Sequence, residues 1–203
     1  MDKTSSTKSK ASPNSKRLFK HDKDWWHNAC LNYSPDSWDL YASGYKDAAD
    51  TLIENVIQTQ RNQDLFVFPV VFLYRQYLEL RMKKLIQEGN NLFDISIKTK
   101  DSHKLDKLWK QTRGILEKVW PDEKNDLDSI ETLINEFSQV DPTSTAFRYP
   151  VNLDGKASIE GLSHINLRNL LETMGSIAKI LDGAFSGIVE NLSIKRDMLN
   201  SVS

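Results

Sequence analysis

The side chains best suited to chemistry are three charged residues inside an otherwise apolar helical pattern. Arg75, Glu79 and Lys83 follow one another at intervals of four, so a helix would carry them on one face. A ladder of ion pairs explains this row without any further function. The alternative is a polar pocket for a phosphate or nucleotide, built from Arg75, Glu79 and Arg148, because the planar guanidinium matches phosphate geometry.

Histidines are the other candidates for acid–base or phosphate chemistry. His103 lies beside a predicted helix start, where it can hydrogen-bond to backbone groups or bind a phosphate with help from the helix dipole. His27 and Cys30 are three apart without a second pair, which does not predict a zinc site. The chain has no Gly-rich phosphate loop, no His-Glu-x-x-His and no Gly-x-Ser-x-Gly. We therefore expect neither a metal nor a cofactor.

The composition predicts one domain preceded by a basic tail. The chain has 203 residues and a formal net charge of -1 at pH 7, so it has no overall attraction to nucleic acid or anionic membranes. Residues 1–24 hold seven Lys or Arg against three Asp and are expected to be a disordered basic tail. Residues 25–203 are then expected to form a single helical-bundle domain. We expect Trp25 and Trp26 either to dock the N-terminal segment onto the bundle or to bind a partner.

Cysteine usage and hydropathy bear on the compartment. The single cysteine, Cys30, fits a reducing environment. No apolar stretch approaches the roughly 20 residues that a membrane-spanning helix needs, and the basic tail lacks the apolar region of a secretory signal. We expect a soluble cytoplasmic protein that makes no membrane contact.

Apolar residues recur at helical spacing through most of the domain, which predicts an all-α bundle of four to five long helices. Ser34 and Pro35 form a helix start, Gly89 with Asn90 and Asn91 is a stop signal, and Ser102 is a predicted N-cap. Residues 141–161 are expected to be irregular, with a short hairpin around Asp154-Gly155. The predicted helices cover about 35–60, 65–89, 102–120, 127–141 and 163–192.

The last predicted helix carries a wide apolar stripe. A central core helix explains the stripe without a partner. The stripe is also wide enough to face a second surface, so this helix, with Phe185 and Val189, is the first candidate for a homodimer interface.

Three segments together resemble the HEPN superfamily, a group of small helical bundles in prokaryotic toxin, antiphage and nucleotidyltransferase-associated proteins. The resemblance covers roughly residues 41–192. One segment is a helix with inward charges, the next is similar to a His-x-Leu-x-x-Leu helix start of the family, and the last is a basic and aromatic stretch. They are Tyr77-Leu-Glu-Leu-Arg-Met-Lys83, Ser102-His-Lys-Leu-Asp-Lys-Leu108 and Arg148-Tyr149-Pro150.

The chain also differs from the ribonuclease members of this superfamily in one motif. Ribonuclease members carry an arginine a few residues before a histidine near the start of the final helix. Here His164 has the expected place, but the nearest upstream arginine, Arg148, is too far along the chain. The resemblance thus implies a binding or regulatory subunit without the usual ribonuclease pair. It would be a homodimer in a bacterial defence or toxin–antitoxin type module, with a protein or RNA partner.

Two alternatives stay open. One is a divergent metal-independent ribonuclease, in which His164 or His103 acts with Arg75 or Arg148. The other is a structural bundle whose only role is assembly. For the binding function, the basic tail would attract phosphates, and the candidate binding residues are Arg75, Glu79, Lys83, His103, Arg148 and Tyr149.

Overall fold

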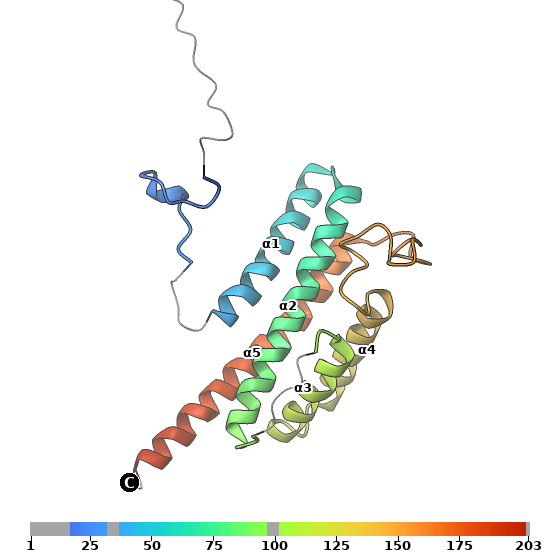
Figure 1. Cartoon of the computed structure of the whole chain (residues 1–203). Coiled ribbons are helices and arrows are strands. Elements are labelled where there is room, and N and C mark those ends of the chain that lie inside the picture. The colour runs from blue at the N-terminus through green and yellow to red at the C-terminus, as the bar shows by residue number, and fades with distance from the viewer. Residues whose placement is uncertain (1–16, 32–36, 97–101, 202–203) are drawn as a thin grey trace, which may run out of the picture. The chain divides into compact units, whose positions relative to one another are not determined.

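Five α-helices make up most of the chain after residue 36 in the computed structural model, which describes residues 17–31, 37–96 and 102–201 (Figure 1). The described residues form no strand longer than a single bridge, so the predicted all-α helical bundle is confirmed. The helices are α1 (Trp38–Thr59), α2 (Gln63–Leu92), α3 (Leu105–Val119), α4 (Lys124–Val140) and α5 (Leu167–Ser201).

The chain divides into two compact units, residues 1–35 and residues 36–203. In the first unit, Trp25–His27 form the short 3-10 helix η2, and His27 Nδ1 lies 2.7 Å from Asp24 Oδ2. The side chains of Trp25 and Trp26 are exposed. Most of the predicted basic tail, residues 1–16, lies outside the described residues, and docking of the two tryptophans stays a prediction.

Helix α2 is the centre of the bundle, since side chains around most of its circumference are buried. Helices α1, α3 and α5 all pack against it, and α4 packs against α3. Its buried apolar side chains meet those of every neighbouring helix in one continuous core. The most completely buried of them are Tyr74, Tyr77, Leu78, Met82 and Leu85.

Helices α2 and α5 run in the same direction. The Tyr77 hydroxyl, in the middle of α2, donates to Asp182 Oδ1 of α5 at 2.9 Å. At the end of α2, the carbonyl of Leu92 accepts from the Lys195 ammonium, which lies further along α5, at 2.9 Å. Because α2 ends at this point, the last turns of α5 continue past it, as Figure 1 shows. This part of α5 therefore has exposed apolar side chains, including Leu199.

The stop predicted at Gly89, Asn90 and Asn91 is close to the observed end of α2, which continues through these residues to Leu92. Gly89 is buried against α3, and a Cβ atom built there would lie 2.3 Å from Ile115 Cγ2. The missing side chain therefore allows close packing of two helices and does not end one.

The predicted cap at Ser102 is wrong. Helix α3 begins after Lys104, whose backbone is extended and whose side chain caps nothing. Ser102 Oγ accepts a hydrogen bond from the Lys104 N–H at 3.2 Å, two residues on, which is a local turn contact. His103, just before α3, contacts Arg75 and Glu79 of α2, so tertiary contacts help to fix where α3 starts.

The other predicted boundaries hold with small shifts. Ser34 and Pro35 lie outside the described residues, and α1 is described from Trp38. The short hairpin is present, because Val151 and Ala157 form an antiparallel bridge around the Asp154-Gly155 turn. Helix α5 starts four residues later than predicted, where Asn166 Oδ1 accepts the Asn169 N–H at 3.0 Å, and it extends to Ser201.

Substitution Gly89→Ala is expected to destabilise the bundle by about 1–3 kcal/mol, because the new methyl group overlaps the stiff β-branched side chain of Ile115. The matched control is Gly114→Ala, a helical glycine with no atom within 4 Å of the added Cβ, which should stabilise the protein by up to about 1 kcal/mol. Urea unfolding of both variants measures the difference. Equal effects of the two changes would contradict this packing role.

Candidate functional site

One face of α2 carries the predicted row of charges, and the structure confirms that they form a ladder of ion pairs. Arg75 Nη1 donates to Glu79 Oε2 at 3.2 Å, and Lys83 Nζ lies 3.0 Å from Glu79 Oε1. Arg75 is only 1% exposed and Glu79 only 4%. Buried charges of this kind are stable only when partners surround them.

Further partners come from outside α2. The Arg75 Nη2 group donates to the backbone carbonyl of His103 at 2.7 Å, and the His103 ring nitrogen Nδ1 lies 2.8 Å from Glu79 Oε1. Arg75 Nε lies 3.6 Å from Asp141 Oδ2, which is an ion pair without a hydrogen bond. We call these five residues, Arg75, Glu79, Lys83, His103 and Asp141, the Arg75 network.

Asp141 was not predicted as a site residue. In the structure it is buried and only 1% exposed. Its second carboxylate oxygen, Oδ1, accepts the backbone N–H groups of Thr145 at 2.8 Å and Ala146 at 3.1 Å. An aspartate directly before a proline often makes such a turn, so a local signal was present. Asp141 thereby links the end of α4 and the following loop to Arg75.

The network keeps Glu79 ionised. Burial acts to raise the pKa of the Glu79 carboxyl, but hydrogen bonds from His103 and Lys83, with the charge of Lys83, outweigh it and hold the pKa below its usual range. Both carboxylate oxygens already have partners. Glu79 is therefore poorly suited to accept a proton from a substrate near neutral pH.

Arg148 and Tyr149 lie on the same side of α2 as the Arg75 network. The Arg148 guanidinium lies 5.5 Å from the ring of Phe72 and 5.5 Å from the ring of Tyr149. Phe72 precedes Glu79 by two helical turns on one face, so the network and Arg148 line one edge of the bundle. Arg148 is exposed, and Tyr149 is 56% exposed.

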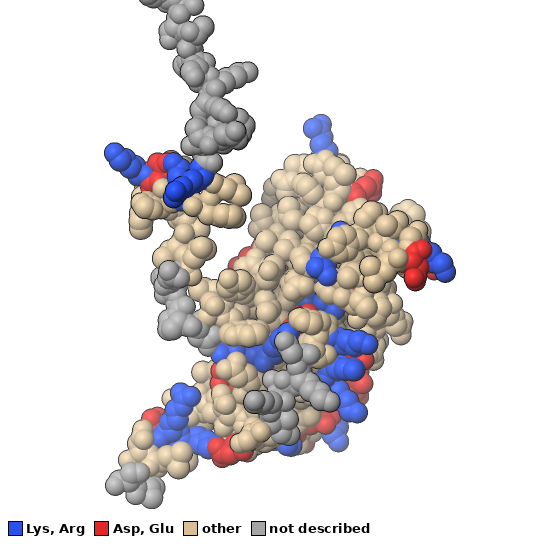
Figure 2. Space-filling model, viewed as in Figure 1, with Lys and Arg blue, Asp and Glu red and all other residues tan. Residues whose placement is uncertain are grey.

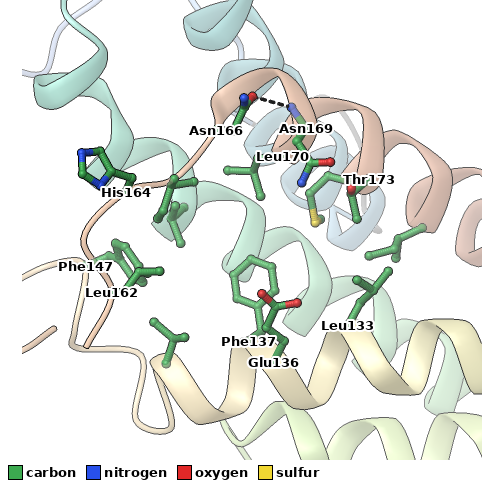
Figure 3. A pocket seen from close by; sticks show the side chains of 15 residues that line it. Leu133, Glu136, Phe137, Phe147, Leu162, His164, Asn166, Asn169, Leu170 and Thr173 are labelled. Carbon is green, nitrogen blue, oxygen red and sulfur yellow. Dashed lines mark hydrogen bonds between the residues drawn. The ribbon is translucent and has the colours of Figure 1, made fainter. Parts of the chain in front are cut away.

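The structure places His164 in a different setting. Its Nδ1 atom lies 3.0 Å from Ser163 Oγ, and its ring stands at the edge of a cavity between α4 and the start of α5 (Figure 3). No hydrogen bond or ion pair joins it to Arg148 in the described ranges of the chain. For the ribonuclease alternative, the structure thus bonds His164 to Ser163, whereas it brings His103 and Arg75 together through the His103 carbonyl.

Exposed lysines at the start of α3 continue the edge that carries Arg148. We call this edge, with Arg148, Lys104, Lys107 and Lys110, the positive edge. Lys104, Lys107 and Lys110 recur every three residues, and none of their side chains forms an ion pair within the described residues. His103, whose side chain is 69% exposed, precedes them. Figure 2 shows Lys and Arg side chains gathered over the middle of the bundle on the face in view. The buried carboxylates of the Arg75 network, Glu79 and Asp141, thus lie beneath a surface that carries positive charges.

A second charged cluster was missed by the sequence prediction. Arg81 is 3% exposed, and its guanidinium lies 2.7 Å from both Asp39 of α1 and Asp182 of α5. It also lies 4.9 Å from the centre of the Phe185 ring. Asp182 accepts the Tyr77 hydroxyl as well, and burial with this nearby anion raises the pKa of Tyr77. The partners come from three helices, so no local pattern indicated the cluster.

The described residues place no three His, Cys, Asp or Glu side chains where they could share a metal ion. None of the helices in the described ranges has the length and hydropathy to span a bilayer. Comparison with protein-family models, with curated proteins and with solved structures finds no match to this chain.

Substitution Glu79→Gln is expected to lower the free energy of unfolding at neutral pH by about 3 kcal/mol, because it removes one partner of a buried ion pair. It should also flatten the acid dependence. The folded-state pKa of Glu79 is lowered, so its contribution is complete above the unfolded value of about 4.3 and is lost as pH falls through the folded value.

Urea unfolding from about pH 7 down to about pH 3 measures both effects. Glu190→Gln is the matched control, since Glu190 is an exposed glutamate on α5 that makes no ion pair within the described residues. If the Glu79 variant lost stability with acid as steeply as the unsubstituted protein, the ionised role of Glu79 would be refuted.

Proposed function

We propose that this chain is a HEPN-like binding subunit that binds RNA without cleaving it, in a cytoplasmic module of the bacterial defence or toxin–antitoxin type. The observation that carries this proposal is the positive edge beside the Arg75 network. Its exposed cations have no acidic partner in the described part of the chain, whereas the buried charges below them are already in ion pairs.

The guanidinium of Arg75 is already paired within the protein, which supports an RNA-binding role over a catalytic one. A phosphate that approached Arg75 would have to displace Glu79, Asp141 or the carbonyl of His103 at a side chain only 1% exposed. Removing one partner from a buried ion pair is costly. Arg75 therefore holds the surface in place, and the exposed residues around it would make the contacts with RNA.

The chemistry of the edge suits a single-stranded nucleic acid. Lys104, Lys107 and Arg148 can neutralise phosphates, which gives affinity that depends on salt. Tyr149 is half exposed beside the Arg148 guanidinium, and an aromatic ring next to a cation is a platform on which a base can stack. The basic residues of segment 1–24 would add further attraction to phosphates.

The double substitution Lys104→Gln/Lys107→Gln should weaken binding to single-stranded RNA and reduce the slope of log K against log salt by about 1.4, since each phosphate contact contributes about 0.7. Tyr149→Ala should cost about 1–3 kcal/mol through lost stacking. Fluorescence anisotropy with labelled RNA in EDTA at several salt concentrations measures both. Deletion of residues 1–24 measures the contribution of the tail.

The matched control is Lys179→Gln, because Lys179 is exposed on α5 beside Glu123 and Asp126 and away from the positive edge. Equal losses in the control and in the Lys104/Lys107 variant would reject the proposed surface. RNA shortening that survives EDTA, and that disappears in Arg148→Ala or His164→Ala with the fold intact, would instead favour the divergent ribonuclease.

A homodimer through α5 is the second part of the proposal. Phe185 is half-buried beneath Arg81, but Val189 and Leu199 are 42% and 61% exposed on the same side of the helix. Val189 follows Phe185 by about one helical turn and Leu199 follows Val189 by nearly three, so a second copy of α5 can pack along this side. Val189 and Leu199 are thus more exposed than the apolar side chains of a helix at the centre of a bundle.

Light scattering after size exclusion should give the mass of a dimer for the unsubstituted protein. Val189→Glu/Leu199→Glu should give a monomer, because charges in an apolar interface are costly to desolvate. Leu153→Glu is the control, since Leu153 is fully exposed in the hairpin turn. A monomeric unsubstituted protein would refute this part of the proposal.

A further inference from the structure

A cavity of about 260 Å³ lies between α2, α4 and the first turns of α5, apart from every residue of the Arg75 network. Its walls are mostly apolar and include Val71, Phe137, Leu170 and Met174. We propose that it binds a small organic cation, an ammonium group attached to a compact apolar body. The proposal is independent of RNA binding.

Three polar side chains of the cavity can accept hydrogen bonds, and two of them, Glu136 and Asn169, are exposed at its mouth. Glu136 of α4 extends its carboxylate toward the middle of the opening, and Asn169 and Thr173 of α5 lie on the facing wall (Figure 3). Asn169 and Thr173 are four apart, so they share one face of α5. An ammonium group has three N–H donors, which can meet a carboxylate, an amide oxygen and a hydroxyl oxygen.

The charge of the lining selects a cation. Glu136 makes no hydrogen bond or ion pair among the described residues, and no Lys or Arg lines the cavity. The ring of His164 is turned away from the centre in Figure 3 and is next to Ser163 Oγ. A ligand cation would therefore supply the counter-charge that the protein does not, while an anion would meet repulsion from Glu136.

The apolar wall and the volume set the size of the ligand. Phe137 follows Glu136 on α4 and also lines the cavity, where an aromatic ring can attract a cation. Sites for drug-sized ligands usually measure about 300–1,000 Å³, so this cavity suits a smaller molecule. An arylalkylammonium ion combines the required charge, shape and apolar area.

Isothermal titration of the full chain with phenethylammonium tests the site. Saturable binding is expected with a dissociation constant of about 1 mM or lower, and phenylacetate, which has the opposite charge on the same ring, should not bind. Glu136→Gln should weaken binding by about tenfold or more, because it removes a charge-assisted hydrogen bond. Thr173→Val should weaken it to a smaller extent.

Glu190→Gln, which removes the same charge elsewhere on the surface, should leave the affinity unchanged. Circular dichroism shows whether each variant retains its helices. The proposal is overturned if phenethylammonium does not saturate, if Glu136→Gln binds it as tightly as the unsubstituted protein does, or if phenylacetate binds equally well.

Discussion

The fold depends on how the bundle accommodates the permanent charge of Arg75 in its interior. The guanidinium cannot lose its proton, so burial at 1% exposure requires acceptors around it. Glu79 supplies one from the same helix, and the His103 carbonyl and Asp141 supply others from the start of α3 and the end of α4. Satisfying one charge therefore fixes where two other helices begin and end.

Arg81 applies the same constraint one and a half turns further along α2. Its ion pairs with Asp39 and Asp182 hold α1 and α5 at a defined height on the central helix. Apolar packing alone tolerates sliding between helices, whereas a buried charge has few acceptable positions. We interpret the two arginines as the groups that select one arrangement of the bundle, with the apolar core supplying most of the stabilisation.

The buried charges also shape the surface above them. Glu79 and Asp141 are used internally, so their negative charge is balanced within the protein, and the exposed cations near His103 and Arg148 determine the character of this edge. The cavity around Glu136 has the reverse arrangement, with an anion that lacks a partner in the described residues above an apolar wall. Two patches with charges of opposite sign thus lie on one small bundle.

Helix positions and the charged row on α2 were predictable from the sequence because they depend on spacing along a single helix. The sequence also placed His103 near the site. It missed the packing role of Gly89, which comes from Ile115 on another helix, and it missed Asp141 and Arg81, whose partners are remote in the chain. The sequence by itself therefore determined the helices and which residues share a face, since both follow from local periodicity. Only the tertiary structure decided which charges meet, because these contacts depend on how distant helices pack.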